Sequence, residues 1–320
     1  MTRLASRNRV FIHSNWRSGG TYFWSKFRLH QAVYGYYEPL FEGLARISAA
    51  TILTDRSWSA LGHNLTAPSK LEYLPHLDAQ GVAGFPVDYC YGGYFLSPRD
   101  EAPELQSYFA QLIEFADAQA KIPAFGMVRS GLRIGWFKAR FGGCHIAIRR
   151  SHRHRWISYL RQAAQGGPYF LERGLIIVGR NRDHPALAGL LDLLDLPDLG
   201  RARAHEEHYR AAMATFSVPR HYVIFAYLAR LQQIEAERHA DLLIDLDQVT
   251  RDAKAARAAE DRLTDLTGLD LALGDCVLPR YDDVLPRWSG FYDEIDTHIF
   301  KAVDAAAMRS DACVTQGPLI

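Results

Sequence analysis

The sequence has 320 residues, of which 48% are hydrophobic and 23% are charged, and its formal net charge is +1 at pH 7. This composition indicates a soluble globular protein with a sizeable core, and it gives no reason to expect nucleic acid or a membrane as a partner. The four cysteines are scattered without a C-x-x-C spacing, so we expect no zinc site, no disulfide framework and a cytoplasmic location.

The first predicted elements are a strand, a helix and a second strand, at 9–12, 21–30 and 34–37. The turn between the first strand and the helix reads NWRSGGT. A glycine-containing turn of this kind gathers backbone N–H groups at the positive end of the helix dipole, and so favours an anion. The residues that we expect to hold this anion are Arg17, Ser18, Gly19, Gly20, Thr21 and Tyr22.

This turn differs from the loop that binds nucleoside triphosphates. A Walker A motif requires G-x-x-x-x-G-K-[ST], and the segment has neither that spacing nor the Lys. The hydroxyl that follows the Lys normally holds magnesium beside the nucleotide. An ATPase or kinase is therefore disfavoured, although LLIDLD at 242–247 resembles a Walker B strand.

The rest of the chain predicts an α/β protein. Residues 51–104 are rich in Pro, Gly, Asn and aromatic side chains, and we expect an irregular insertion that lines an acceptor site. Beyond it, strands are predicted at 124–128, 145–148, 175–178 and 242–246, and helices at 105–120, 132–140, 153–164, 186–194, 201–214, 222–238 and 249–266. This alternation predicts one domain over 1–320, a three-layer α/β/α fold with a mostly parallel central sheet and a helix-rich C-terminal half.

A second anion site is predicted where the strand at 145–148 ends. The segment that follows, IRRSHRHRWISY at 148–159, is strongly basic. Ligands of parallel sheets bind at the carboxyl ends of the strands, which is where Arg150 lies. Ser158 follows about two turns into the next helix. Two anion sites on one sheet suit a ligand that carries phosphate groups at two ends.

Three segments together resemble the sulfotransferases that use 3′-phosphoadenosine 5′-phosphosulfate. NWRSGGTYFWSKF at 15–27 resembles their 5′-phosphosulfate loop, in the R-S-G form of the carbohydrate enzymes. IRRSHRHRWISY resembles their 3′-phosphate motif R-[DN]-P-R-D-x-x-x-S-x, with Ser151 and His152 in place of the usual Asp-Pro. YYEPLFEGL at 36–44 resembles the F-E-P-L-W segment of the galactose and N-acetylglucosamine 6-O-sulfotransferases. The likeness spans about half of the chain and is nearest to soluble bacterial sulfotransferases.

The resemblance implies transfer of a sulfuryl group from 3′-phosphoadenosine 5′-phosphosulfate to a hydroxyl acceptor, with no required metal. A saccharide or glycolipid acceptor is favoured, and tyrosyl and phenolic acceptors stay open. Arg17 and residues 18–22 would bind the 5′-phosphosulfate, and Arg150 and Ser158 the 3′-phosphate. Glu38 would be the catalytic base, and Arg17 would be the second catalytic residue. Pro39 follows Glu38, and the proline ring restricts the backbone there by fixing the φ angle of Pro39.

Several alternatives stay open at this point. Glu42 or His13 could serve as the base in place of Glu38. An altered P-loop kinase and a non-catalytic nucleotide- or anion-binding module are the other functions. The oligomeric state has no signature in the sequence.

Overall fold

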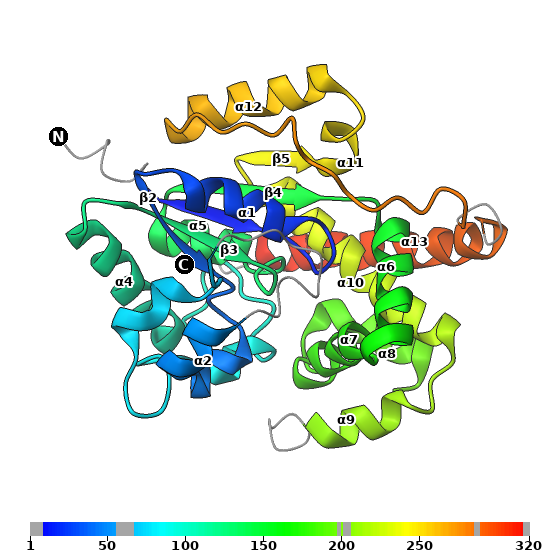
Figure 1. The fold of residues 1–320 in the computed structure, drawn as a ribbon. Coiled ribbons are helices and arrows are strands. Elements are labelled where there is room, and N and C mark those ends of the chain that lie inside the picture. The colour runs from blue at the N-terminus through cyan, green and yellow to red at the C-terminus, as the bar shows by residue number, and fades with distance from the viewer. Residues whose placement is uncertain (1–8, 56–66, 197–199, 201–205, 285–288, 316–320) are drawn as a thin grey trace. The chain divides into compact units, whose positions relative to one another are not determined.

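The structure, a computed structural model, describes residues 9–55, 67–196, 200, 206–284 and 289–315. Five strands form one parallel sheet in the order β2-β3-β1-β4-β5 (Figure 1). The strands are β1 (Val10–His13), β2 (Val33–Tyr37), β3 (Ile122–Met127), β4 (Cys144–Arg149) and β5 (Leu242–Asp245). The predicted α/β class with a parallel sheet is therefore confirmed.

Helices cover both faces of this sheet. The crossover from β1 to β2 runs in the direction opposite to those from β2 to β3 and from β3 to β4, so right-handed connections place their helices on opposite faces. The helices of these crossovers are α1 (Gly20–Leu29), α4 (Pro103–Ala118) and α5 (Ile134–Phe141). Side chains of α1 join one core cluster, and those of α4 and α5 join another. This arrangement is compatible with a three-layer α/β/α fold.

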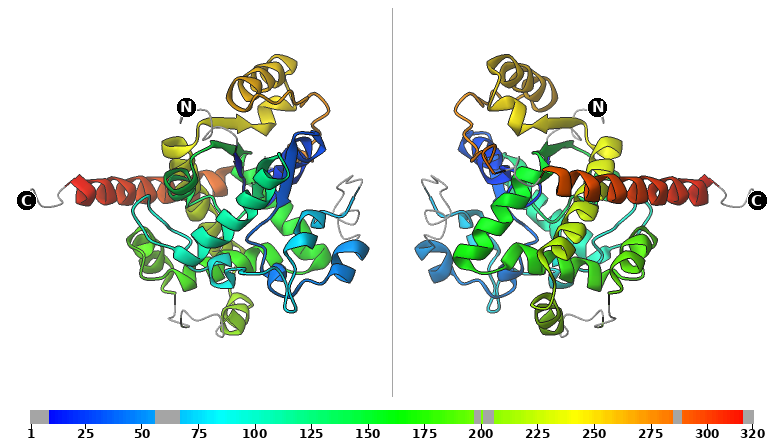
Figure 2. Two further views of the ribbon diagram at one scale, coloured as in Figure 1. Left: turned by 90° about the vertical axis from the view of Figure 1, so that its left-hand side faces the viewer. Right: turned by 90° about the vertical axis from the view of Figure 1, so that its right-hand side faces the viewer.

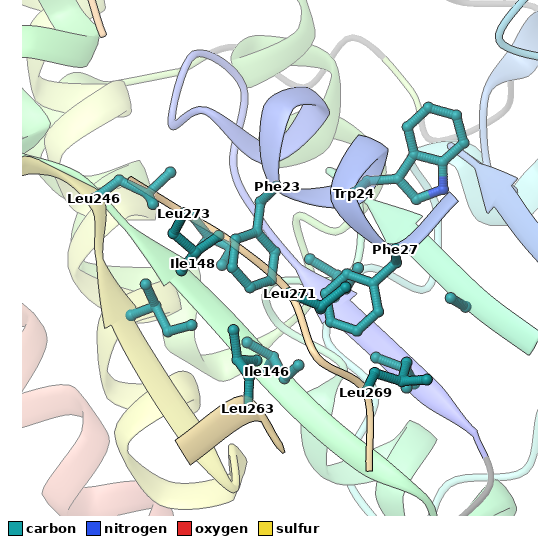
Figure 3. Packing of buried hydrophobic residues seen from close by; sticks show 14 of the residues in the cluster. Phe23, Trp24, Phe27, Ile146, Ile148, Leu246, Leu263, Leu269, Leu271 and Leu273 are labelled. Atoms are coloured by element: carbon teal, nitrogen blue, oxygen red, sulfur yellow. The ribbon is translucent and has the colours of Figure 1, made fainter. Parts of the chain in front are cut away.

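Alternation along the strands supplies both cores. Val10 and Ile12 on β1 belong to the α1 cluster, whereas Phe11 between them belongs to the α4–α5 cluster. Figure 3 shows Phe23 and Phe27 of α1 beside the β4 residues Ile146 and Ile148, with the chain that carries Leu269, Leu271 and Leu273 alongside. After β5, the chain continues into the helices α11 (Leu246–Val249) and α12 (Ala253–Thr267), which Figure 2 shows from two sides.

The chain divides into two compact units. One consists of Met1–Cys90, Leu96–Arg150 and Glu235–Leu278, and it contains the whole sheet. Its shorter elements are α2 (Ala49–Thr54), η2 (Glu42–Arg46), η3 (Leu71–His76) and η4 (Val87–Cys90). Three of these lie wholly or partly in the predicted insertion at 51–104, and the role of that insertion as an acceptor wall stays a prediction.

The other unit consists of Tyr91–Phe95, Ser151–Ile234 and Pro279–Ile320. Its helical elements are α6 (His152–Gly166), α7 (Tyr169–Arg180), η5 (Pro185–Leu187), α8 (Ala188–Leu194), α9 (Glu206–Met213), most of α10 (Val218–His239) and α13 (Ser289–Thr315). A buried carboxylate, Asp296, accepts hydrogen bonds from His152, Arg153 and Tyr222 at 2.6–2.9 Å. Burial pushes the pKa of Asp296 upward, but these hydrogen bonds outweigh that effect and leave the pKa below its ordinary value.

One predicted strand is wrong. Residues 175–178, Leu-Ile-Ile-Val, lie inside α7 and are all buried. A short apolar run that is buried on every side has no periodicity that separates a strand from a helix. None of the helices that the structure describes has both the length and the apolar character needed to span a bilayer.

Candidate functional site

The carboxyl edge of the sheet collects most of the predicted site residues. Because the strands are parallel, the loop after β1, Glu38 after β2 and Arg150 after β4 all lie at this edge. The register aligns these ends, since His13 pairs with Met127 and Ala147, and Tyr37 pairs with Gly126. The crossover after β1 runs toward the β2 edge of the sheet, and the crossover after β3 runs toward the β5 edge. Ligands of open parallel sheets bind at the point between two such strands.

The loop after β1 is tied together by Ser18. The Ser18 hydroxyl donates to the carbonyl oxygen of Asn15 at 2.7 Å and accepts from the Asn15 N–H at 3.1 Å. The Ser18 N–H also donates to Asn15 O, at 3.1 Å. Arg17, between them, has a φ of 65°, which is uncommon for a residue other than glycine. Ser18 therefore shapes the predicted anion loop from within.

Two glycines complete the entry to α1. Gly19 has a φ of 90° and is the N-terminal cap, and no side chain caps the helix there. The first N–H groups of any helix have no acceptor within the helix, so this end offers donors to an anion. A Cβ on Gly20 would lie 2.2 Å from Ser14 Oγ, which shows how closely the loop returns to the helix.

Substitution of Gly20 by Ala is expected to destabilise the protein by about 1 to 3 kcal/mol, because the added methyl group collides with Ser14. The second substitution Ser14→Gly, which removes the colliding atoms, is expected to restore most of this loss. Urea denaturation measures both. Gly274→Ala is the matched control, since a Cβ there meets no atom within 4 Å. Equal stability of the Gly20→Ala and Gly274→Ala variants would contradict this packing.

The hydroxyl groups of Thr21 and Tyr22 form hydrogen bonds with different parts of the chain. Thr21 Oγ1 lies 2.5 Å from the hydroxyl of Tyr37, the last residue of β2. The hydroxyl of Tyr22 donates to Asp275 at 2.6 Å and to Leu273 O at 3.2 Å, on the segment after α12. Thr21 therefore connects the anion loop to the end of β2, whereas the Tyr22 hydroxyl is engaged with the segment after α12.

Arg150 reaches the anion loop directly. Its Nη1 donates to the carbonyl oxygen of Arg17 at 3.0 Å, and its Nε lies 3.6 Å from Asp247 Oδ1. The residue is 5% exposed, so the guanidinium is held in place by its surroundings. Ser158, its predicted partner in phosphate binding, is buried on α6 in the other compact unit, and its role stays a prediction.

Glu38 has a strained backbone that its surroundings hold. Its φ is 45°, and together with Arg17 it accounts for two of the four positive-φ residues other than glycine among the described residues. The Glu38 N–H donates to Gly126 O at 2.7 Å, and Glu38 O accepts from Phe41 N at 2.9 Å. A left-handed backbone conformation at a residue other than glycine costs free energy, and such residues are concentrated at functional sites. Glu38 has such a strained backbone at the carboxyl edge of the sheet, and its role as the base stays a prediction.

Two charged residues that the sequence did not predict as part of the site lie beside Glu38. Arg129, just past β3, donates to Glu38 Oε2 at 2.6 Å and to Glu42 Oε2 at 2.6 Å. Lys70, also buried, donates to Tyr37 O at 2.6 Å and lies over the rings of Tyr37, Phe41 and Tyr73. The rule that ligands bind at strand ends would have found Arg129, but Lys70 lies in the irregular segment and has no comparable signal.

Burial lowers the pKa of Lys70 from 10.5 to about 7, although the nearby Glu38 charge partly opposes this. Between these values the unfolded chain binds one more proton than the native protein, so the free energy of unfolding should rise with pH, by about 1 kcal/mol per unit. Below about pH 7 both states are protonated and this contribution stays constant.

The Lys70→Met variant is expected to lack this rise. Urea denaturation of wild type and variant at several values between about pH 6 and about pH 9 gives the comparison. Lys254→Met, at an exposed position on α12, should keep the wild-type pH dependence. If the difference in stability between the Lys70→Met variant and wild type does not change with pH, the lowered pKa is wrong.

His13, the weaker candidate for a base, belongs to an internal chain of hydrogen bonds. His145 Nε2 lies 2.9 Å from Gly142 O, which can only accept, so this nitrogen carries the proton. Burial lowers the pKa of His145 to about 4, so the ring is neutral and its Nδ1 accepts from His13 Nε2 at 3.0 Å. His13 Nδ1 then accepts from the Ser130 hydroxyl at 2.8 Å. Both ring nitrogens of His13 are thus engaged, which favours a role in orienting the loop.

Comparison with protein-family models, curated proteins and solved structures finds no match to this chain.

Proposed function

We propose that this protein is a sulfotransferase that moves the sulfuryl group of 3′-phosphoadenosine 5′-phosphosulfate to a hydroxyl acceptor of the saccharide or glycolipid class. One contact carries most weight. Arg150, predicted to bind the 3′-phosphate, donates a hydrogen bond to the backbone of Arg17 in the predicted phosphosulfate loop. Arg17 and Arg150 were predicted from separate segments to bind anions at two ends of one ligand. They lie next to each other at the carboxyl edge of one sheet.

The donor would be held by positive groups that follow β1 and β4. The uncapped start of α1 and Arg17 would bind the 5′-phosphosulfate, and Arg150 the 3′-phosphate. The resemblance also implies Ser158 and Tyr22, although the Tyr22 hydroxyl is hydrogen-bonded to Asp275. Since Arg150 also lies 3.6 Å from Asp247, a bound phosphate would compete with that carboxylate for the guanidinium.

The reaction would proceed by in-line displacement at sulfur. The acceptor oxygen forms a bond to sulfur while its proton passes to the Glu38 carboxylate. The bond from sulfur to the bridging oxygen breaks, and its electron pair stays on the 5′-phosphate of adenosine 3′,5′-bisphosphate. Charge spreads over the sulfuryl oxygens and the leaving phosphate, so positioning and charge stabilisation by Arg17 and α1 would provide most of the catalysis.

Ligand-dependent thermal stabilisation separates this function from its alternatives. A sulfotransferase should be stabilised by adenosine 3′,5′-bisphosphate more than by ADP, with or without magnesium. A preference for ADP with magnesium would support an altered P-loop kinase. Binding of the bisphosphate, with no labelled product from ³⁵S-labelled donor in any saccharide, glycolipid or phenol pool, would support a non-catalytic module.

A further inference from the structure

Arg129 is a buried cation that two carboxylates share. Its side chain is 1% exposed, and those of Glu38 and Glu42 are 15% and 24% exposed. A buried guanidinium requires compensating charge, because transfer of an ion out of water is costly. Each carboxylate meets a different terminal nitrogen at 2.6 Å, so a single planar fork fixes both side chains.

The Glu38 carboxylate has a second contact that leads back to the anion loop. Burial, and then the charge of Glu38, raise the pKa of Tyr37 well above its ordinary value, so the phenol keeps its proton. The Tyr37 hydroxyl donates to Glu38 through a side-chain hydrogen bond, and therefore accepts from Thr21. Hydrogen bonds thus run from the first turn of α1 through Tyr37 and Glu38 to Arg129.

Arg129 also adjoins the anion loop itself. Its guanidinium carbon lies 5.4 Å from the ring centre of Trp16, in the loop after β1, and 5.6 Å from that of Phe41. The two carboxylates differ in their attachment. Glu38 follows β2 in a strained, fully hydrogen-bonded backbone, whereas Glu42 begins the short turn η2. Glu38 is therefore the more rigidly placed of the two.

We propose that Arg129 is a positioning residue that aims the Glu38 carboxylate at the acceptor hydroxyl, with Glu42 as the counter-charge that leaves Glu38 available as the base. This inference rests on the proposed sulfotransfer. It assigns the two carboxylates different roles, because Glu38 lies in the hydrogen-bonded chain from α1 and has the more rigidly placed backbone. Lys in place of Arg129 keeps the charge but cannot reach both carboxylates as a planar fork.

The Arg129→Lys variant should lower kcat by about 100-fold, the cost of a misplaced catalytic group, while the KM for the donor changes little. Arg129→Ala should lose more, and added guanidinium ions should restore part of its activity by occupying the vacated space. Arg28→Lys is the matched control, since Arg28 forms a similar pair with Glu72 at 2.6 Å away from the strand ends. A wild-type kcat in Arg129→Lys overturns the proposal, as does a folded Arg129→Ala variant that guanidinium leaves unchanged.

A crystal structure of the Arg129→Lys variant provides a readout that does not depend on activity. The proposal expects the Glu38 carboxylate to move from its wild-type position, and an unmoved carboxylate overturns it. If wild type transfers no sulfate but the carboxylate moves in the variant, the proposed reaction fails while the positioning by Arg129 stands. If wild type transfers sulfate but the carboxylate stays in place in the variant, the proposed positioning by Arg129 is wrong while the proposed sulfotransfer stands.

Discussion

Replacement of Glu38 by Gln is expected to lower kcat for sulfate transfer by about two to four orders of magnitude, the range that a general base contributes. The amide has nearly the shape of the carboxylate but cannot take the acceptor proton. Donor binding should persist, because the predicted donor contacts come from the loop after β1 and from Arg150. Steady-state kinetics measure the first effect, and thermal stabilisation by adenosine 3′,5′-bisphosphate the second.

Two further variants decide what a loss in Glu38→Gln means. Glu72→Gln breaks an ion pair with Arg28 of similar exposure, so it should change kcat only a few-fold if the Glu38 effect is catalytic. Glu42→Gln removes the second carboxylate on Arg129 and should cost less than Glu38→Gln. A larger loss in Glu42→Gln would assign the base to Glu42, and near-normal turnover in Glu38→Gln would remove Glu38 from the role.

Replacement of Arg150 by Gln is expected to reduce the preference for adenosine 3′,5′-bisphosphate over adenosine 5′-monophosphate. A charge-assisted hydrogen bond contributes about 1.5 to 3 kcal/mol, which corresponds to a decrease of about 10- to 100-fold in relative affinity. The ratio of the two dissociation constants is the useful quantity. General damage to the loop through the lost contact with Arg17 O would weaken both ligands and leave the ratio unchanged.

Arg149→Gln is the control for this experiment. Arg149 is the neighbouring residue on β4, carries the same charge and pairs with Asp245 at 3.0 Å, but its side chain is 46% exposed. Its loss should leave the ratio close to that of wild type. If the ratio falls equally in both variants, the effect comes from the lost positive charge in general and not from a specific contact. An unchanged ratio in Arg150→Gln would show that Arg150 does not bind the 3′-phosphate.

The sheet was predictable because its strands are short apolar runs bounded by turn residues. The predicted strands at 9–12, 34–37, 124–128, 145–148 and 242–246 all coincide with observed ones to within two residues. The run at 175–178 failed because a buried helix of apolar residues has the same local appearance as a buried strand. The strand order was not predictable, since pairing depends on partners that lie far apart along the chain.

The residues of the candidate site also fall into two groups, those that the local sequence identifies and those that only the fold brings together. Gly19, Gly20 and Arg17 were identifiable, because a turn between a strand and a helix is encoded by adjacent residues. Lys70 and Arg129 were not identified, since each acquires its role from a neighbour that the fold supplies. Arg129 meets Glu38 across 91 residues of chain, and Lys70 meets Tyr37 across 33.

The sequence by itself therefore determined the strands, the turn after β1 and the acidic and basic residues that follow the strands, because these depend on local periodicity and turn chemistry. Only the tertiary structure decided that Arg150 contacts the backbone of Arg17 and that one guanidinium holds both Glu38 and Glu42. Parallel pairing sets the strand ends side by side, and burial there leaves a charged group stable only beside its partner.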